Sequence, residues 1–386
     1  NGEYPSVRLG MMRGNKPRDL VFSTNKDGDH GLIAGTTGTG KSELLMTVIT
    51  GIALRYDPTF VNFVLVDYKG GTAFEAFRPL PHVVDVITNL QGYAGARAFT
   101  AIRAELNRRS KILADANASD IGDYRRRELH INVPLPHLFI IIDEFAEMVK
   151  DRPEFKTQLE AIARLGRALG VHLILATQRP AGVVSDQIRA NMRFRICLRV
   201  ETSEDSRELL GRSDAAFLPG NIPGRAYLQI GNDRLDLIQV ARVGGNFQGR
   251  RTETQPAVVW LTRQNQSTPG REPVLSTTLV NELIKMMSNL AQNRKLPVQM
   301  KPWHDPLPEQ VYLGDPGLNP SLDEWLHGQG TWGKVDWMQQ AMHASVGILD
   351  HPAEARQFAF VVDLTVGHLV AFGASGWGKT TLLRSL

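Results

Sequence analysis

The sequence predicts an α/β fold with a mostly parallel central sheet, followed by the start of a second domain of the same kind. Short apolar segments alternate with helical segments over most of the chain before Gly244, a pattern typical of a parallel sheet with connecting helices. The glycine-rich pattern G-x-x-x-x-G-K-[ST] also occurs twice, beginning at Gly35 and again 338 residues later at Gly373. A repeat at this distance indicates a duplicated domain and not a short solenoid unit.

Continuous apolar segments, which are typical of strands buried on both faces, define the expected sheet. These segments are residues 30–34, 61–66, 138–142, 171–176 and 194–200. Residues 226–230 and 235–240 flank the turn residues 231–234 and are typical of a hairpin.

Helices are expected between these strands. Residues 43–54 contain few helix breakers, and residues 157–169 end at Gly170, a common stop signal. Within residues 92–116, Ala98, Ile102 and Leu106 recur at four-residue spacing, which is typical of an amphipathic helix.

The composition of the sequence changes after the first domain, which we assign to residues 1–245. Residues 246–340 are assigned to a C-terminal helix, expected at 274–292, and to a linker rich in proline and tryptophan. Residues 341–386 then resemble the start of the chain, with strands expected at 358–362 and 368–372 before the second glycine-rich loop.

Composition excludes several classes of protein. Hydrophobic residues make up 42% and charged residues 22% of the chain, so it can form a core and is not disordered. The single cysteine, Cys197, excludes a disulfide scaffold and a cysteine-rich zinc site. A net charge of +4 gives little support for nucleic-acid binding. The sequence contains no run of about 18 apolar residues, so it predicts no membrane span.

The first glycine-rich loop matches the phosphate-binding P-loop pattern in full, between an expected strand and an expected helix. Its glycines let backbone N–H groups converge on phosphate oxygens, and the helix N-terminus adds positive potential. The lysine is expected to reach the β- and γ-phosphates of ATP, and the serine to bind Mg²⁺. The loop is Gly35, Thr36, Thr37, Gly38, Thr39, Gly40, Lys41 and Ser42.

The second loop matches the same pattern, with Trp377 at a variable position. Its expected nucleotide ligands are Gly373, Gly378, Lys379 and Thr380. The sequence does not decide whether this second site is active.

A P-loop ATPase also needs acidic residues on a neighbouring strand. Residues 138–142 lead directly into Asp143 and Glu144. We expect Asp143 to hold Mg²⁺ through water and Glu144 to polarise the attacking water. Two surface acids at a strand end are the alternative.

Other polar residues end strands near this edge. Gln178 or Thr177, after residues 171–176, is a candidate sensor of the γ-phosphate, with a purely structural role as the alternative. Asp67 ends another strand and could equally be a turn residue before Gly70.

Enzymes of this class often use an arginine from a neighbouring subunit. Several arginines lie late in the first domain, and Arg195 and Arg207 are the preferred candidates, with solvated surface arginine as the alternative. The basic run 125–127 could contact DNA, but a solvated helix end explains it more simply, because no aromatic residues are interleaved with it.

Several motifs together resemble a known family. LFIIIDEF, LILATQRP and the run at 188–211 resemble the FtsK/SpoIIIE branch of RecA-like motor ATPases. LVDYKGGTAF at 65–74, GRSDAAFLPGNIPGRAYL at 211–228 and the tandem P-loop are similar to the EccC ATPases of type VII (ESX) secretion systems. The resemblance spans most of residues 6–243 and 345–386.

The resemblance implies a RecA-like P-loop ATPase that uses ATP and Mg²⁺. It assigns Lys41 and Ser42 to the nucleotide, Asp143 and Glu144 to hydrolysis and Gln178 to sensing. It also implies export of small helical proteins at the cytoplasmic face of the bacterial inner membrane. Expected partners are secretion-system membrane components and further copies of the chain in a hexameric ring, and DNA is not expected.

Two alternatives stay open from the sequence. A double-stranded DNA translocase of the same branch is the first. A nucleotide-binding scaffold with little turnover is the second, and the intact Glu144 disfavours it. Because the chain stops at Leu386, shortly after Lys379, we expect it to be a fragment of a longer polypeptide whose membrane anchor lies elsewhere.

Overall fold

The computed structural model describes residues 4–68, 70, 73–88, 93–232, 234–245, 278–297, 301, 303–304, 307–308, 310–312, 314–315, 343–354 and 356–385. The chain divides into two compact units. The first unit comprises Asn1–Gly92 and Leu106–Met300, and the second comprises Tyr93–Glu105 and Lys301–Leu386.

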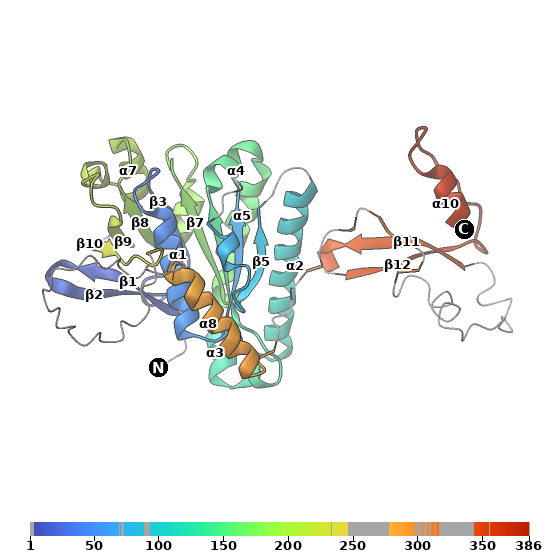
Figure 1. Cartoon of the computed structure of the whole chain (residues 1–386), viewed down its shortest axis with the longest axis horizontal. Coiled ribbons are helices and arrows are strands. Elements are labelled where there is room, and N and C mark those ends of the chain that lie inside the picture. The colour runs from blue at the N-terminus through green and yellow to red at the C-terminus, as the bar shows by residue number, and fades with distance from the viewer. Residues whose placement is uncertain are drawn as a thin grey trace, which may run out of the picture. The chain divides into compact units, whose positions relative to one another are not determined.

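One ten-stranded sheet organises the described part of the first unit, in the order β2-β1-β10-β9-β8-β3-β7-β6-β4-β5 (Figure 1). The strands from β8 to β5 in this order are parallel, whereas β9, β10, β1 and β2 are antiparallel. The predicted α/β fold with a mostly parallel sheet is therefore confirmed. The strands are β1 (Ser6–Met12), β2 (Lys16–Val21), β3 (Gly31–Ala34), β4 (Val61–Asp67), β5 (Val83–Ile87), β6 (His137–Asp143), β7 (Val171–Thr177), β8 (Phe194–Leu198), β9 (Arg225–Ile230) and β10 (Arg234–Val240).

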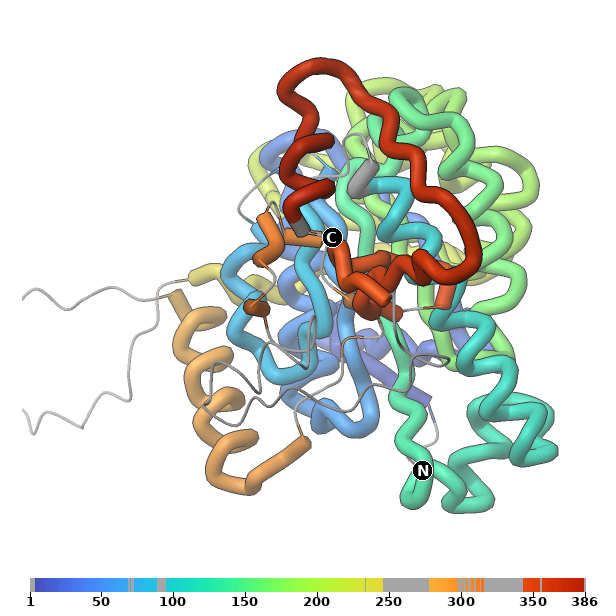
Figure 2. The backbone as a smooth tube through the Cα atoms, turned by 90° about the vertical axis from the view of Figure 1, so that its right-hand side faces the viewer, coloured from blue at the N-terminus to red at the C-terminus, as the bar shows by residue number. Residues whose placement is uncertain are grey.

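Helices cover both faces of this sheet. Helices α1 and α8 pack against each other, and Figure 2 places α8, in orange, on the opposite side of the unit from the green helices, which include α5. None of the described helices is both long and apolar enough to cross a membrane. The helices are α1 (Lys41–Arg55), α2 (Tyr93–Asp115), α3 (Ile121–Arg126), α4 (Phe145–Asp151), α5 (Glu154–Leu169), α6 (Asp186–Asn191), α7 (Ser203–Leu210) and α8 (Leu279–Asn293).

The alternation of side chains along β6 explains how the core forms. Phe139 and Ile141 belong to the cluster that α1 and α8 cover, whereas Ile140 and Ile142 are equally buried but lie outside that cluster. Successive strand residues point to opposite faces. Both faces of β6 are therefore apolar and covered, which is why its sequence reads as a continuous apolar run.

The sequence did not predict the hairpin of β1 and β2. Strand β2 contains Pro17 and several charged residues, which give no apolar signal. Its stability comes from tertiary contacts instead. The buried guanidinium of Arg18 forms ion pairs of 2.9 Å with Asp27 and 3.0 Å with Asp236 on β10.

The second unit contains a two-stranded antiparallel sheet of β11 (His343–His351) and β12 (Arg356–Asp363), and helix α10 (Lys379–Ser385). Within this unit, Arg97 forms a buried ion pair of 2.7 Å with Asp350, and it lowers the pKa of that carboxyl. The strand predicted at 358–362 is confirmed as part of β12.

The strand predicted at 368–372 is wrong, because these residues are irregular. In the first unit, β3 enters the P-loop with a ladder partner on each side, β7 and β8. The described residues of the second unit offer no such pair of strands to residues 368–372. Apolar character alone does not make a strand when no neighbour pairs with it.

Three histidines, His30, His137 and His172, lie buried at the sheet edge far from the P-loop. His172 on β7 contacts His137 with an Nε2–Nδ1 distance of 3.0 Å, and its Nδ1 lies 3.1 Å from the carbonyl oxygen of Asp29. Burial lowers the pKa of His172 to about 4. Burial, and then the nearby His172, lowers the pKa of His30 to about 3.

His30 and His172 predict that the fold weakens in mild acid. The pKa of each is lower in the folded chain than in the unfolded chain, so only the unfolded chain gains protons as the pH falls below about 6.5. The free energy of unfolding should therefore fall by about 1.4 kcal/mol per pH unit for each histidine between about pH 6 and pH 4.5. Urea unfolding at several pH values measures this slope, and the exposed-site control His351→Gln should not alter it. A free energy of unfolding that is constant over this range would contradict the prediction.

Candidate functional site

The register of the parallel strands brings the predicted site residues to one edge of the sheet. Ala34, the last residue of β3, pairs with Thr177 on β7, so the P-loop begins beside the carboxyl end of β7. Asp143 ends β6, and it pairs with Asp67 at the end of β4. The carboxyl ends of parallel strands are the common place for a ligand in open α/β sheets.

The P-loop is held in place by backbone hydrogen bonds to the neighbouring segments. The amide of Gly35 donates to the carbonyl of Thr177 at 3.2 Å, and the amide of Thr36 donates to the carbonyl of Arg199 at 3.1 Å. Gly40 has a φ of +101°, and a side chain there would lie 2.9 Å from the backbone nitrogen of Gly224. Glycine is therefore required at this position, immediately before Lys41 begins α1.

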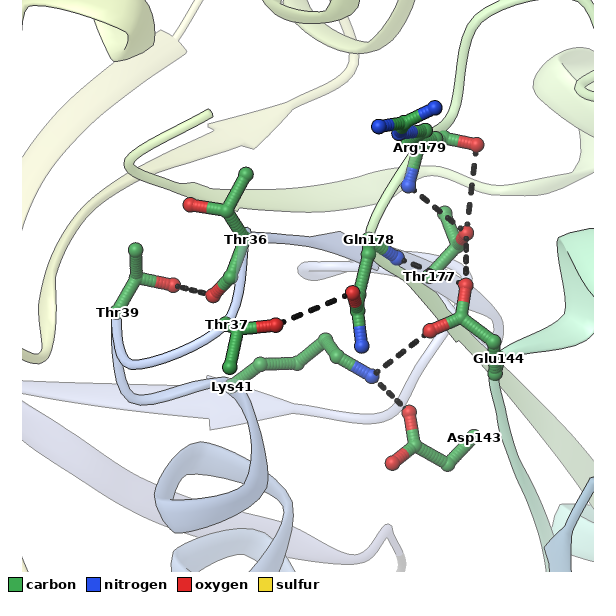
Figure 3. A network of polar contacts seen from close by, with 9 residues as sticks. All are labelled: Thr36, Thr37, Thr39, Lys41, Asp143, Glu144, Thr177, Gln178 and Arg179. Carbon is green, nitrogen blue, oxygen red and sulfur yellow. Dashed lines mark hydrogen bonds and ion pairs between the residues drawn. The ribbon is translucent and has the colours of Figure 1, made fainter. Parts of the chain in front are cut away.

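Lys41 connects the P-loop to the two acids (Figure 3). Its buried ammonium forms an ion pair with Asp143 and lies 3.9 Å from Oε2 of Glu144. The predicted grouping of one lysine with two consecutive carboxylates is thus present in the structure.

Glu144 is held with its carboxylate aimed into the site. It follows β6 in a left-handed conformation, with φ 59° and ψ 47°, immediately before α4. Its Oε1 accepts hydrogen bonds from the hydroxyl of Thr177 at 2.9 Å and from the amide of Gln178 at 3.1 Å. This backbone turn redirects the side chain from the strand end towards Lys41 (Figure 3).

The two sensor candidates occupy different places. The side chain of Gln178 lies at the P-loop, where Thr37 donates a hydrogen bond of 3.2 Å to its amide oxygen. The side chain of Thr177 is buried and holds Glu144. Of the two candidates, Gln178 lines the cavity described below, whereas the hydroxyl of Thr177 contacts Glu144.

A cavity of about 590 Å³ opens over these residues, a volume within the range of small-molecule sites. The P-loop forms one side of it. The other lining residues come from the acid strand, from the end of β7 and from the region around β10. The lining residues are Thr36, Thr37, Gly38, Gly40, Lys41, Ser42, Glu43, Asp143, Gln178, Pro223, Gly224, Gln239, Val240, Ala241 and Arg242.

The donor set in this cavity fits Mg²⁺. Ser42 and Asp143 both line it and supply hydroxyl and carboxylate oxygens, which this hard cation prefers. The described residues contain no cluster of three or more histidine, cysteine or acidic side chains that could hold a metal by themselves. Mg²⁺ usually retains several waters and is bound by one or two carboxylates together with substrate phosphates, so two protein ligands are sufficient.

The two candidate arginines lie outside this cavity. Arg195 is buried on β8 and pairs in register with Leu32, three residues before Gly35. It lines a separate cavity of about 310 Å³ together with Arg167, Arg189 and Arg193. Burial, and then the neighbouring Arg189, lowers the pKa of Arg195. Arg207 is exposed on α7.

The basic run 125–127 behaves as the end of α3. Arg126 and Arg127 are exposed and lie 3.8 and 3.5 Å from the carboxylate of Asp123. Arg125 lies over the ring of Phe60, with 4.1 Å between its guanidinium carbon and the ring centroid. This arrangement agrees with a structural role for the run.

The second P-loop is exposed in the described part of the second unit. The ammonium of Lys379 donates to the carbonyls of Gly373 at 2.6 Å and Ala374 at 2.7 Å, so the lysine folds back onto its own loop. The described residues of this unit include no strand equivalent to β6 that would bring acids towards Thr380.

Comparison with known proteins shows which of them this chain resembles. The FtsK/SpoIIIE family matches residues 3–182. The chain is 36% identical over its full length to the type VII secretion system protein EssC of Staphylococcus aureus, and it spans about a quarter of that protein, namely 26%.

Two solved structures are also similar. The cytoplasmic domain of the type VII secretion ATPase EccC of Thermomonospora curvata matches with a TM-score of 0.79 and 30% identity, over 98% of this chain and 41% of that chain. The pCW3 conjugation coupling protein TcpA, solved with ATPγS, matches with a TM-score of 0.54 and 26% identity, over 63% of this chain and 67% of that chain. The chain therefore contains an FtsK/SpoIIIE domain at residues 3–182, and it is similar over nearly its full length to the EssC and EccC proteins of type VII secretion.

Proposed function

We propose that this chain is an ATP-hydrolysing motor segment that powers the export of small helical proteins through a type VII secretion system. The observation that carries the proposal is the grouping of Lys41, Asp143 and Glu144 under a P-loop cavity. The similarity to EssC and EccC supplies the transport role. By the same similarity, we place the motor at the cytoplasmic face of the bacterial inner membrane, with other secretion-system membrane components as partners.

In this proposal each residue has one task. Lys41 and the P-loop amides bind the β- and γ-phosphates, and Ser42 and Asp143 hold Mg²⁺, which neutralises charge on the phosphates. Because Lys41 forms an ion pair with Asp143, the nucleotide phosphates compete with Asp143 for the lysine. Glu144 accepts a proton from the attacking water, and Gln178 contacts the γ-phosphate.

The proposal includes a ring, hexameric in the full assembly, in which one subunit completes the site of its neighbour. A catalytic arginine is worth about 10³–10⁵ in rate in related phosphoryl-transfer enzymes. Neither Arg195 nor Arg207 lines the P-loop cavity of its own chain. We therefore retain both as candidates that act on a neighbouring subunit.

Mixing two inactive variants tests this arrangement. A variant with Arg195→Ala and Arg207→Ala retains its own acids, whereas Glu144→Gln retains its arginines. Mixed oligomers should regain a measurable part of the hydrolysis rate, because some sites combine an intact Glu144 with a neighbour's intact arginines. If mixed rings form without any regain of hydrolysis, neither arginine acts between subunits.

Whether the motor moves protein or DNA is tested by measuring which of the two stimulates ATP hydrolysis. A protein-export motor should hydrolyse ATP faster in the presence of a secreted helical substrate and should not respond to linear double-stranded DNA. Stimulation by DNA alone would replace the proposal with a DNA translocase, the distant alternative within the same family.

A further inference from the structure

The segment that follows β10, residues 241–245, forms part of the wall of the P-loop cavity. We name this segment the strap. Ala241 and Arg242 line the cavity, and so does the preceding Val240. The side chain of Arg242 is 77% exposed, and its Nε lies 4.0 Å from Oε1 of Glu43 on α1.

The strap lies on the side of the P-loop that the acids leave open. Asp143 contacts the ammonium of Lys41, and Gln178 contacts Thr37. By contrast, the amide of Gly224, a neighbour of the strap in the cavity lining, donates to the carbonyl of Thr39 at 2.8 Å. For a nucleotide whose γ-phosphate lies near Glu144 and Gln178, the part of the cavity lining at Gly224 and the strap is the part left for the nucleoside.

Helix α1 holds the strap through two side chains. Glu43 follows the P-loop serine, and its Oε2 accepts hydrogen bonds from the backbone amides of Val243 at 3.2 Å and Gly244 at 3.1 Å. One turn further along, the hydroxyl of Thr47 donates to the carbonyl of Ala241 at 2.7 Å. Helix α1, which begins in the P-loop, therefore also holds the strap in place.

The ends of the strap are anchored as well. The amide of Ala241 donates to the carbonyl of Leu9 on β1 at 2.8 Å, and the carbonyl of Gly245 accepts from the amide of Leu279 on α8 at 2.9 Å. The middle of the strap packs so closely on Glu43 that a side chain at Gly244 would lie 2.1 Å from Oε1 of the glutamate. Glu43 and Gly244 therefore fit each other.

We propose that Glu43 is a positioning residue for nucleotide binding, which acts by holding the strap as the wall that receives the nucleoside part of ATP. The inference rests on the proposed function, because it assumes that the cavity binds ATP. It assigns Glu43 neither to the phosphates nor to the proton transfer. Loss of Glu43 should therefore weaken recognition of the nucleoside and leave the phosphate site intact.

The test compares ATP with inorganic tripolyphosphate, which has the phosphates but no nucleoside. Calorimetric titration of the full chain carrying Glu43→Ala should give about tenfold weaker binding of ATP and less than about a twofold change for tripolyphosphate, a tenfold change being 1.4 kcal/mol. In steady state, KM for ATP should rise by a similar factor and kcat should stay within about twofold. Glu43→Gln should behave like the wild type, since its amide oxygen can accept both hydrogen bonds.

Two further variants make the test specific. Gly244→Ala should reproduce the effect of Glu43→Ala without removing any charge, because the added methyl group would lie 2.1 Å from Oε1 of Glu43 and would push that carboxylate away from the strap amides. Glu154→Ala removes a carboxylate from the first turn of α5, outside the cavity, and should leave ATP binding unchanged. Unchanged ATP affinity in Glu43→Ala would overturn the inference, and so would equal losses for ATP and tripolyphosphate. A wild-type chain that does not bind ATP would instead overturn the proposed function itself.

Discussion

Replacing Glu144 by glutamine should stop hydrolysis and leave ATP bound. The carboxylate accepts two hydrogen bonds through Oε1, from Thr177 and from the amide of Gln178, and a glutamine oxygen can accept both. The shape of the site should therefore persist. What is lost is the ability to take a proton from water, which is worth about 10²–10⁴ in rate.

Radiolabelled or fluorescent ATP measures both parts of this expectation. Glu144→Gln should bind ATP with the wild-type affinity and release no more than about a hundredth of the wild-type phosphate per unit time. Glu147→Gln is the matched control, because it removes the same charge from the first turn of α4. Hydrolysis by Glu144→Gln at the wild-type rate would show that another group activates the water.

Replacing Lys41 by alanine should abolish ATP binding. The ammonium of Lys41 is buried at the centre of the site, and it forms charge-assisted contacts that are stronger than neutral hydrogen bonds. Several such contacts to phosphate oxygens, at about 1.5–3 kcal/mol each, predict a loss of at least about a hundredfold in ATP affinity. Hydrolysis should disappear with binding.

Fluorescent-nucleotide titration measures this loss, and circular dichroism checks that the variant is folded. The check matters because removal of the lysine leaves Asp143 and Glu144 close together without their shared cation. Lys150→Ala, at an exposed position on α4, is the control and should bind ATP normally. ATP affinity within about twofold of the wild type in Lys41→Ala would contradict the assignment of the P-loop.

The central part of the fold could be predicted because its signals are local. Strands β4, β6 and β7 are buried on both faces and therefore read as apolar runs, and a P-loop has a fixed pattern. The hairpin of β1 and β2 could not be predicted in this way. It depends on the contact between Arg18 and Asp236, which lies more than two hundred residues away in the chain.

The grouping of the site residues was predictable, but their geometry was not. Strand order explains why Lys41 and Asp143 meet, since residues at the carboxyl ends of neighbouring parallel strands share one edge. The left-handed turn at Glu144 and its hydrogen bond to Thr177 are tertiary features without a sequence pattern. The contacts of Glu43 also lack a sequence pattern, because its partners Val243 and Gly244 follow β10, about 200 residues later in the chain.

The arginines illustrate a different limit. Arg195 and Arg207 lie late in the domain, where an arginine for a neighbouring subunit is expected. The position of a residue in the sequence does not, however, say where its side chain points. In the structure Arg195 lies with three other arginines in a cavity of its own, and Arg207 lies on the surface. The experiment with two kinds of subunit tests whether either residue acts on the site of a neighbour.

The central claim is that hydrolysis at the site of Lys41, Asp143 and Glu144 drives protein export. The most direct measurement is the amount of small helical substrate secreted by cells whose full-length protein carries Glu144→Gln, with Glu147→Gln cells as the control. We expect secretion to be lost in the first and retained in the second, with equal amounts of the two proteins in the cells. Secretion at the wild-type level from Glu144→Gln cells would contradict the claim.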